Sequence, residues 1–181
     1  QSDDLSKMPV GKRVAVIGGG MTAIDVAVQS KLLGAEEVTI VYRRGQEEMG
    51  ASEFEQDLAT SKGVVIRHNA MPVKVKKKGG KLAAVVCEKT ATAGGKLKGT
   101  GETFEIACDT LFKAIGQTAI DVTSGALALS GGRIIIDAEK RTSVKGIWAG
   151  GDCVAGGQDL TVAAVDEGRR AAESIHAYLT S

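Results

Sequence analysis

The sequence predicts an α/β fold, built on a parallel sheet with a second layer of antiparallel strands. Two short apolar runs, at residues 13–18 and 38–42, are typical of strands that are buried on both faces. Between them, apolar residues recur at helical spacing, and a glycine-rich turn precedes this helix. Two strands joined by a crossover helix lie parallel in one sheet, so these observations predict a parallel core.

The first half of the chain repeats this alternation of strand and helix. We expect, in order, a strand at 13–18, a helix at 21–33, a strand at 38–42, a helix at 52–61 and a strand at 64–66. Gly34 and Gly63 each follow a predicted helix, where a left-handed residue is common. Ser52 and Glu55 have the spacing of a capping box. These elements predict one βαβαβ half of a doubly wound sheet.

The apolar pattern becomes alternating in the middle of the chain. Gly79-Gly80 and Gly94-Gly95 interrupt it, and paired glycines between alternating runs are hairpin signals. We therefore expect a three-stranded antiparallel meander over 70–107. The lysines between 74 and 81 resemble a nucleic-acid patch, but few aromatic residues interleave with them, so a solvated strand face is favoured.

The last third of the chain predicts a second, smaller group of elements. A buried strand at 109–116 is followed by a glycine-rich stretch over 117–132, which is typical of a connection between domains. We expect two short strands, at 133–137 and 146–149, and a final helix at 161–179.

Composition narrows the classes of partner. The chain has 181 residues, 43% of them hydrophobic and 25% charged, with a formal net charge of +1. This balance gives no reason to expect nucleic acid or an anionic membrane as a partner. No apolar run approaches the roughly 18 residues of a membrane span. The chain begins at Gln1 without a signal-peptide pattern, so we expect a cytoplasmic protein and a processed or excised chain.

The cysteines and histidines form no cluster in the sequence. Cys87, Cys108 and Cys153 are widely spaced, with no CxxC pair and no zinc or iron–sulfur spacing. We expect buried, reduced thiols and no metal site. His68 and His176 are isolated, and the sequence predicts no catalytic residue.

The first motif with chemical meaning is Gly18-x-Gly20-x-x-Ala23. It follows a predicted buried strand and opens a helix, which is the context that a dinucleotide-binding turn requires. Gly18 allows the tight turn, Gly20 allows the backbone to approach a pyrophosphate, and the small Ala23 allows helix and strand to pack closely. The free N–H groups and the dipole at the helix N-terminus favour the phosphates.

Arg43 and Arg44 end the second strand, about 20 residues after the glycine turn, where the residue that reads the adenosine ribose falls. An acidic residue there would accept hydrogen bonds from the 2′-hydroxyl of NAD(H). Arginine instead donates charge-assisted bonds to the 2′-phosphate of NADP(H), each worth about 1.5–3 kcal/mol. The sequence therefore predicts that NADP(H) is preferred and NAD(H) is the alternative cofactor, unless the arginines only face solvent.

The second motif is Trp148-Ala149-Gly150-Gly151-Asp152, at the end of a predicted strand and before a helix. Ligands bind at the carboxyl ends of strands in open α/β sheets. A carboxylate at Asp152 could accept hydrogen bonds from the ribityl hydroxyls of a flavin. The N-terminus of the helix near Thr161 could stabilise the negative charge of the reduced flavin ring.

Together these motifs resemble those of the flavoproteins that contain two dinucleotide-binding domains. The similar segments are 18–25 (GGGMTAID), 42–44 (YRR), 114–117 (AIGQ) and 149–153 (AGGDC). The most similar branch contains the glutamate synthase small subunit and dihydropyrimidine dehydrogenase. Residues 29–52 and the phrase FKAIGQ resemble the NAD(P)H-oxidising FAD subunit of bacterial dihydropyrimidine dehydrogenase. The resemblance covers residues 10–180.

The resemblance implies a Rossmann-like NAD(P)-binding domain over 10–120 and the C-terminal segment of a split FAD-binding domain over 130–181. It implies NADP(H) contacts at Gly18, Gly20, Met21, Thr22, Ala23, Ile24, Arg43, Arg44, Ala114, Ile115 and Gly116, and FAD contacts at Gly151, Asp152, Leu160, Thr161 and Val162. By the same resemblance, residues 47–49 are expected near the nicotinamide.

Two features of the family are missing from this sequence: an FAD-binding glycine motif near the N-terminus and a cysteine-rich iron–sulfur region. We therefore expect FAD and iron–sulfur clusters to belong to the full-length protein. The chain alone is expected to hold no stoichiometric FAD and to be inactive. The sequence also lacks the CxxC of thioredoxin reductases, which disfavours dithiol exchange.

The predicted function is that of an NAD(P)H-dependent flavoprotein oxidoreductase module. In the full-length protein, hydride would pass from NADPH to FAD, and electrons would pass on to a partner catalytic subunit of a redox complex. That subunit would reduce a pyrimidine or aminate 2-oxoglutarate. Two alternatives stay open: an isolated nucleotide-binding fragment without turnover, and a ferredoxin- or thioredoxin-reductase-like flavoprotein. A yellow colour from bound flavin would distinguish an active flavoprotein from a fragment.

Overall fold

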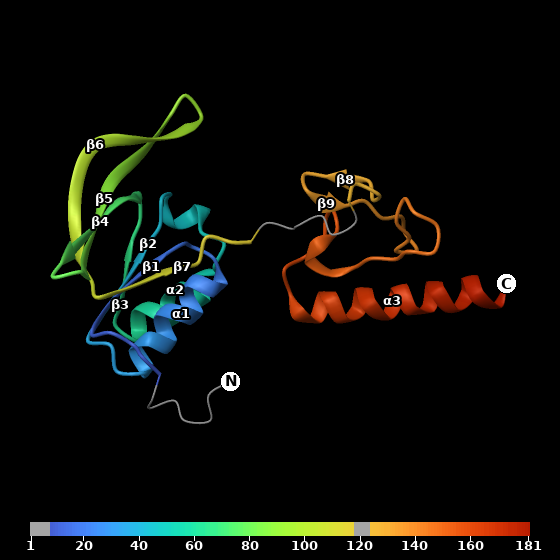
Figure 1. Cartoon of the computed structure of the whole chain (residues 1–181), viewed down its shortest axis with the longest axis horizontal. Coiled ribbons are helices and arrows are strands. Elements are labelled where there is room, and N and C mark those ends of the chain that lie inside the picture. Colours follow the sequence, from blue (N-terminus) through green and yellow to red (C-terminus); the bar gives the residue numbers. More distant parts are fainter. Residues whose placement is uncertain (1–7, 118–123) are drawn as a thin grey trace. The chain divides into compact units, whose positions relative to one another are not determined.

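The computed structural model describes residues 8–117 and 124–181, and the chain divides into two compact units, an N-terminal unit of residues 1–116 and a C-terminal unit of residues 117–181 (Figure 1). The predicted domain limit at 120 falls within residues 118–123, which are outside the described residues, and the predicted limit at 130 falls within the second unit.

The N-terminal unit is built on a four-stranded parallel sheet in the order β3-β2-β1-β7. Its strands are β1 (Arg13–Ile17), β2 (Glu37–Val41), β3 (Val64–Arg67) and β7 (Thr110–Lys113), and its helices are α1 (Met21–Leu32) and α2 (Glu53–Ser61). The predicted α/β fold is therefore confirmed. Ser52 caps α2 as predicted, since its hydroxyl accepts from the Glu55 N–H while the Glu55 carboxylate accepts from the Ser52 N–H at 2.7 Å.

Successive residues of β1 enter two different hydrophobic clusters. Val14 and Val16 pack with residues of α1 and α2 on one face of the sheet. Ala15 and Ile17 pack on the other face, with Val85 and other residues of the antiparallel strands. This alternation follows from the two-residue period of a strand. It explains why β1 is apolar at nearly every position: both of its faces are covered.

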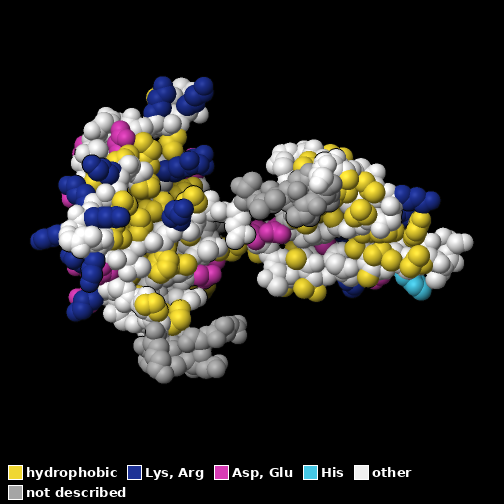
Figure 2. Space-filling view, viewed as in Figure 1, with side chains coloured by type: hydrophobic (Ala, Val, Ile, Leu, Met, Phe, Trp, Pro, Cys, Tyr) yellow, Lys and Arg dark blue, Asp and Glu magenta, His cyan; other side chains and the backbone are white. Residues whose placement is uncertain are grey.

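The predicted meander is present as β4 (Ala70–Lys78), β5 (Lys81–Ala93) and β6 (Lys96–Ala107), paired antiparallel in that order. Both glycine pairs have positive φ angles, which a two-residue hairpin turn of this kind requires. The lysines of β4 are exposed, and Lys76 forms an ion pair with Glu105 of β6. Figure 2 shows Lys and Arg side chains scattered over this unit among hydrophobic ones, not gathered into one patch.

The C-terminal unit contains β8 (Leu129–Ser130), β9 (Arg133–Ile134) and the long helix α3 (Thr161–Thr180). The predicted strand at 133–137 is shorter than expected, and the predicted strand at 146–149 is wrong. Only Trp148 of that segment forms a bridge, with Arg141. The apolar residues there predict a strand, but a strand forms only where a neighbour pairs with it. β8 lies within the predicted connection, 117–132, of which residues 118–123 are outside the described residues.

The cysteines match the predicted state only in part. Cys87 and Cys108 are buried free thiols, whereas Cys153 is half-buried. Burial, with a smaller contribution from Cys108, raises the pKa of the Cys87 thiol to about 11. The two buried thiols are thus protonated and belong to the core. Among the described residues, no helix has the length and hydropathy to cross a membrane, and no three His, Cys, Asp or Glu side chains are grouped as metal ligands.

Candidate functional site

The turn between β1 and α1 can be formed only by glycine at its first position. Gly18 has φ +143°, and a Cβ atom there would lie 2.1 Å from the carbonyl oxygen of Ala114. At Gly19 a Cβ would strike the ring of Tyr42, at 2.3 Å. Gly20, in contrast, has no atom within 4 Å of such a Cβ. The turn therefore packs against Ala114, which follows β7, and Tyr42, which follows β2. It is open at Gly20, where a ligand could approach the backbone.

The first turn of α1 offers backbone donors to that open space. Gly20 is the N-cap, no side chain caps it, and no acidic residue stands in the first turn. Met21 is half-buried and Thr22 is exposed, whereas Ala23 and Ile24 are buried against the sheet. Uncapped N–H groups and the positive end of the helix dipole favour an anion. Ala23 and Ile24 already donate their N–H groups to the Gly20 carbonyl, at 2.9 and 3.3 Å, so the donors that face the open space are those of Met21 and Thr22.

Residues 114–116 lie beside the glycine turn. β7 pairs with β1, and the Ala114 N–H donates to the Ile17 carbonyl at 2.7 Å. Ile115 is 68% exposed, and Gly116 has φ +86°. Because β2 and β3 lie on one side of β1 and β7 on the other, the sheet order reverses between β1 and β7. Open α/β sheets bind ligands at such a switch point, and the structure brings two predicted contact segments together there.

Arg43 and Arg44 follow the carboxyl end of β2, at the same edge of the sheet. Their carbonyls are fixed, since Arg43 accepts from the Thr90 hydroxyl at 2.6 Å and Arg44 accepts from the Asn69 N–H at 2.9 Å. The Arg43 side chain is exposed, while the Arg44 Nε lies 3.7 Å from a Glu48 carboxylate oxygen. Arg43 is therefore the better placed of the two to bind a phosphate, because Arg44 has a carboxylate as a competing partner.

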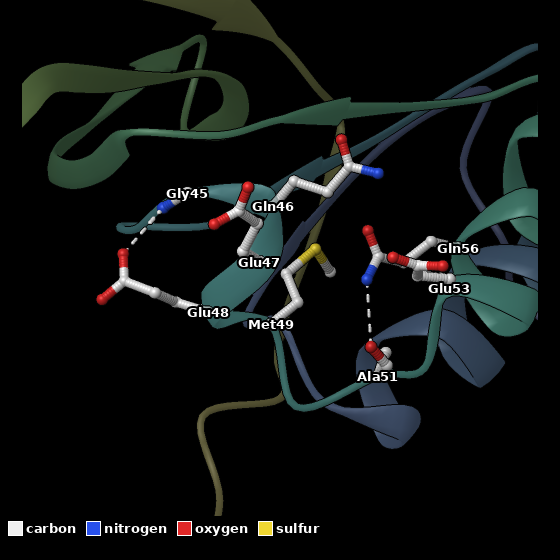
Figure 3. A pocket seen from close by; sticks show the side chains of 8 residues that line it. All are labelled: Gly45, Gln46, Glu47, Glu48, Met49, Ala51, Glu53 and Gln56. Carbon is white, nitrogen blue, oxygen red and sulfur yellow. Dashed lines mark hydrogen bonds between the residues drawn. The ribbon is translucent and has the colours of Figure 1, made fainter.

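The loop between β2 and α2 borders an open hollow of about 820 Å³, whose lining side chains are drawn in Figure 3. The short helix η2 (Gln46–Glu48) forms one wall and the first turns of α2 form another. The lining residues are Gly45, Gln46, Glu47, Glu48, Met49, Ala51, Glu53 and Gln56. The Ala51 N–H donates to the Gly19 carbonyl at 3.0 Å, so this loop is tied to the glycine turn.

One residue of the hollow, Gln56, was not singled out from the sequence, whereas Met49 belongs to the segment 47–49 that was expected near the nicotinamide. Gln56 is only 4% exposed, and its Nε2 donates to the Ala51 carbonyl at 3.0 Å. The only indication of Gln56 in the sequence is a polar residue on the side of the predicted helix that faces the core. Met49 Sδ lies 3.3 Å from Nε2 of His68, whose pKa is lowered by burial. Burial thus favours the neutral form of His68, which packs against Met49 behind the lining residues.

In the C-terminal unit, the segment Gly150–Asp152 lies against α3. The Gly151 N–H donates to Glu167 Oε2 at 2.5 Å, and Lys140 Nζ lies 2.9 Å from Glu167 Oε1. The Lys140 and Glu167 side chains are 10% and 19% exposed. The Lys140 ammonium, followed by the Gly151 N–H, lowers the pKa of Glu167. No sequence pattern predicts this pair, because its members lie 27 positions apart.

The predicted flavin contacts of this unit occupy one region. Asp152 is exposed in the short helix η3 (Gly151–Cys153), and a Cβ on Gly151 would lie 3.5 Å from Ala164 Cβ in the first turn of α3. Leu160 is the N-cap of α3 without a side-chain cap, and Thr161 and Val162 are exposed beside it. An exposed carboxylate and an uncapped helix N-terminus are suited to hydroxyl groups and to developing negative charge, respectively.

The parallel sheet, the glycine turn at its switch point and the arginines after β2 define a dinucleotide-binding α/β protein. A match to a known family narrows this class further. The chain belongs to the pyridine nucleotide-disulphide oxidoreductase family, whose model matches residues 1–168.

Several relatives are similar over nearly the whole chain. It is 35% identical to the NADP(+)-dependent formate dehydrogenase subunit beta of Moorella thermoacetica, over 93% of this chain and 25% of that protein. It is 36% identical to the glutamate synthase [NADPH] small chain of Escherichia coli, over 93% of this chain and 39% of that protein. It is 31% identical to the NADPH-Fe(3+) oxidoreductase subunit beta of Geobacter sulfurreducens, over 94% of this chain and 30% of that protein. The chain thus spans well under half the length of these relatives.

Solved structures show the same fold. The thioredoxin reductase of T. acidophilum superposes with a TM-score of 0.81 at 26% identity, over 97% of this chain and 55% of that one. The thioredoxin reductase of Lactococcus lactis superposes with a TM-score of 0.80 at 26% identity, over 97% of this chain and 55% of that one. The predicted resemblance to the glutamate synthase small subunit branch is confirmed. The nearer resemblance to dihydropyrimidine dehydrogenase stays a prediction.

Proposed function

We propose that this chain is the nucleotide-binding part of an NADPH-dependent flavoprotein oxidoreductase, and that it carries one portion of the FAD site. The observation that carries the proposal is the uncapped N-terminus of α1 at the switch point of the sheet, with Arg43 exposed at the same edge. Three relatives are named for NADP(+) or NADPH, which supports NADP(H) as the preferred cofactor and NAD(H) as the alternative.

The residues of the N-terminal unit would bind and orient the dinucleotide. The N–H groups of Met21 and Thr22 would donate to the pyrophosphate, because those of Ala23 and Ile24 already donate to the Gly20 carbonyl. Arg43, and Arg44 if it leaves Glu48, would donate to the 2′-phosphate. Gly116, with open space above it, would leave room for the half of the dinucleotide that crosses towards β7. The bound nicotinamide and flavin would supply the redox chemistry.

The C-terminal unit would contribute to flavin binding. Asp152 would accept hydrogen bonds from ribityl hydroxyls, and the first turn of α3, from Leu160 to Val162, would face the ring. Glu167 would act through Gly151, since its carboxylate holds that backbone N–H. We propose that the remaining FAD contacts and any iron–sulfur clusters belong to a longer protein, because the relatives are much longer than this chain.

The electrons would leave to a partner catalytic subunit. The relatives are named as subunits or as a small chain, and we propose such a partner here, with a pyrimidine or 2-oxoglutarate as the class of final substrate. Two buried free cysteines favour a reducing, cytoplasmic compartment. A role as a nucleotide-binding fragment without turnover is the second candidate. A thioredoxin-reductase-like activity is disfavoured, because the chain has no CxxC.

Calorimetric titration with NADPH and NADH tests the cofactor assignment. We expect NADPH to bind about 100-fold more tightly than NADH, which corresponds to one or two charge-assisted bonds. Arg43→Glu should narrow or reverse this preference, because it adds repulsion as well as removing a donor. Lys74→Glu, an equal charge change on an exposed strand of the meander, is the matched control. Equal affinities for the two cofactors in the unaltered protein would contradict the assignment.

The absorption spectrum and a ferricyanide assay test the flavin assignment. We expect the purified chain to hold no stoichiometric FAD and not to oxidise NADPH, because the glycine turn that would hold a pyrophosphate is already assigned to NADPH. A yellow protein with one FAD per chain, or NADPH turnover without an added partner, would show that this chain is a complete flavoenzyme.

A further inference from the structure

The Glu48 carboxylate is held beside Arg44 by the fold of its own loop. Its Oε2 accepts a hydrogen bond from the Gly45 N–H at 3.2 Å (Figure 3), and its Oε1 lies 3.7 Å from Arg44 Nε. The Tyr42 hydroxyl donates to the Glu48 carbonyl, and the Glu48 N–H donates to the Gly45 carbonyl at 3.2 Å. Because both the backbone and the side chain of Glu48 are bound, the carboxylate keeps its place even if Arg44 turns away.

The arginine side of this contact is fixed at the backbone and free at the side chain. The carbonyls of Arg43 and Arg44 accept hydrogen bonds from Thr90 and Asn69, so only the two guanidinium groups can adjust to a ligand. The Arg44 and Glu48 side chains are 43% and 55% exposed, so a ligand can reach both. Among the described residues, Arg44 is paired with a carboxylate and Arg43 is not.

The fixed carboxylate acts differently on the two nicotinamide cofactors. A phosphate monoester carries a charge of about −1.5 to −2 at pH 7. A 2′-phosphate bound between Arg43 and Arg44 would be repelled by Glu48 and would compete with it for the Arg44 guanidinium. NADH has an uncharged hydroxyl at this position, which is not repelled and can donate a hydrogen bond to a carboxylate.

We propose that Glu48 is a specificity-determining residue that limits the preference for NADPH and keeps NADH usable as a second cofactor. It would do so by holding Arg44 and by repelling the 2′-phosphate. Attractive arginines and a repulsive carboxylate in one loop set specificity as a difference between two affinities. This inference rests on the proposed function, in which the arginines bind the 2′-phosphate. For Glu48 it replaces the expected place near the nicotinamide.

Calorimetric titration of Glu48→Gln with NADPH and NADH tests the proposal. Glutamine keeps a carbonyl oxygen that can accept from the Gly45 N–H, so the loop should keep its conformation while the charge is lost. We expect NADPH to bind about 5–10-fold more tightly, and NADH to bind equally or more weakly. Glu36→Gln, which removes the carboxylate of the Lys12 pair just before β2, is the matched control. It should change either affinity by less than about 2-fold.

A double-mutant cycle tests whether Glu48 acts through Arg44. In the unaltered protein, Arg44→Gln should weaken NADPH binding by only about 3-fold, because Glu48 occupies this guanidinium. In the Glu48→Gln background, where Arg44 is free for the phosphate, the same change should cost about 10-fold or more. Equal losses in the two backgrounds, or NADPH binding that is unchanged or weaker in Glu48→Gln, would overturn the proposal.

An NMR measurement without any cofactor gives an independent readout. The Arg44 Nε–H signal should shift in Glu48→Gln relative to the unaltered protein, whereas the Arg43 signal should shift less, because only Arg44 is paired with Glu48. An unmoved Arg44 signal would contradict the pairing. If the unaltered protein binds neither cofactor, the proposed function itself fails. If it prefers NADPH and Glu48→Gln leaves that preference unchanged, only the role of Glu48 fails.

Discussion

The N-terminal and C-terminal units bury their hydrophobic side chains to different extents. In the N-terminal unit, the parallel sheet has a hydrophobic cluster on each face, one under α1 and α2 and one under the meander. In the described part of the C-terminal unit, Leu127 and Val154 are the buried hydrophobic residues, and no residue of α3 is buried. Val162, Val165 and Leu179 of α3 are 77%, 68% and 74% exposed.

Polar contacts take a larger part in the C-terminal unit. Glu167 joins α3 to Lys140 and to Gly151, and the indole N–H of Trp148 donates to the Ser174 hydroxyl at 2.9 Å. The Trp148 and Tyr178 rings meet edge to face, with centroids 5.4 Å apart. Directed contacts of this kind fix geometry but bury little apolar area, and apolar burial is the dominant favourable contribution to folding. The N-terminal unit therefore has the core of an independent domain, whereas the described part of the C-terminal unit is ordered mainly by polar contacts.

Separating the units gives the strongest test of this comparison. Residues 8–116 produced alone should unfold in one cooperative transition in urea, because both faces of the sheet stay covered. Residues 117–181 alone should show no cooperative transition, since a two-stranded sheet and an unburied helix cannot offset the loss of chain entropy. Circular dichroism during the titration checks both. A sharp transition in the C-terminal piece would show that its polar contacts suffice.

A large-to-small substitution in the sheet should have the next largest effect. Ile40 is fully buried in β2, and Ile40→Ala should lower the free energy of unfolding by about 2–5 kcal/mol, through lost burial and a cavity. Val162→Ala, at an exposed position of α3, should change it by less than about 0.5 kcal/mol. Urea denaturation measures both. Similar losses for the two variants would mean that α3 has a covered face in solution.

The Lys140–Glu167 pair should affect the C-terminal unit alone. Lys140→Met leaves the Glu167 carboxylate without its cation and should weaken the local structure by about 1–3 kcal/mol. Amide hydrogen exchange of Gly151 and of α3 should accelerate accordingly, while exchange in β1 should not change. Lys145→Met removes an exposed lysine nearby and serves as the control. Unchanged exchange at Gly151 would show that its hydrogen bond to Glu167 does not depend on the ion pair.

Acidification should weaken the two units at different pH values. We expect these changes in stability to be smaller than those caused by the substitutions above. Burial lowers the pKa of His68 from 6.5, so its neutral form is favoured in the folded state, and this contribution is lost as the pH falls below about 6.5. Lys140 and Gly151 lower the pKa of Glu167 from 4.5, so that contribution is present above about 4.5 and is lost as the pH falls further. Hydrogen exchange at several pH values should show the N-terminal unit loosening first. His68→Gln should abolish the earlier step.

The elements of the N-terminal unit could be predicted because their signals are local. The strands and helices follow from apolar spacing, the ends of α1 and α2 from glycine and from the Ser52 capping box, and the hairpins from two glycine pairs. The predicted strand at 146–149 was wrong because strand formation there depends on a non-local contact. Its apolar residues are compatible with a strand, but whether a strand forms depends on a neighbour that the local sequence does not specify.

Some features of the candidate site could likewise be predicted from local sequence, and others depend on tertiary packing. The sequence by itself determined the glycine turn, the positions of Arg43 and Arg44, and the motif around Asp152, because residue type and spacing fix the conformation of a turn and the charge that it presents. Only the tertiary structure decided that Ala114 closes over Gly18, that Gln56 has a buried free acceptor, and that Lys140 meets Glu167. Each of these contacts joins segments whose approach is set by packing of the sheet, turns and helices. Burial and hydrogen bonding depend on that approach, and no local pattern encodes it.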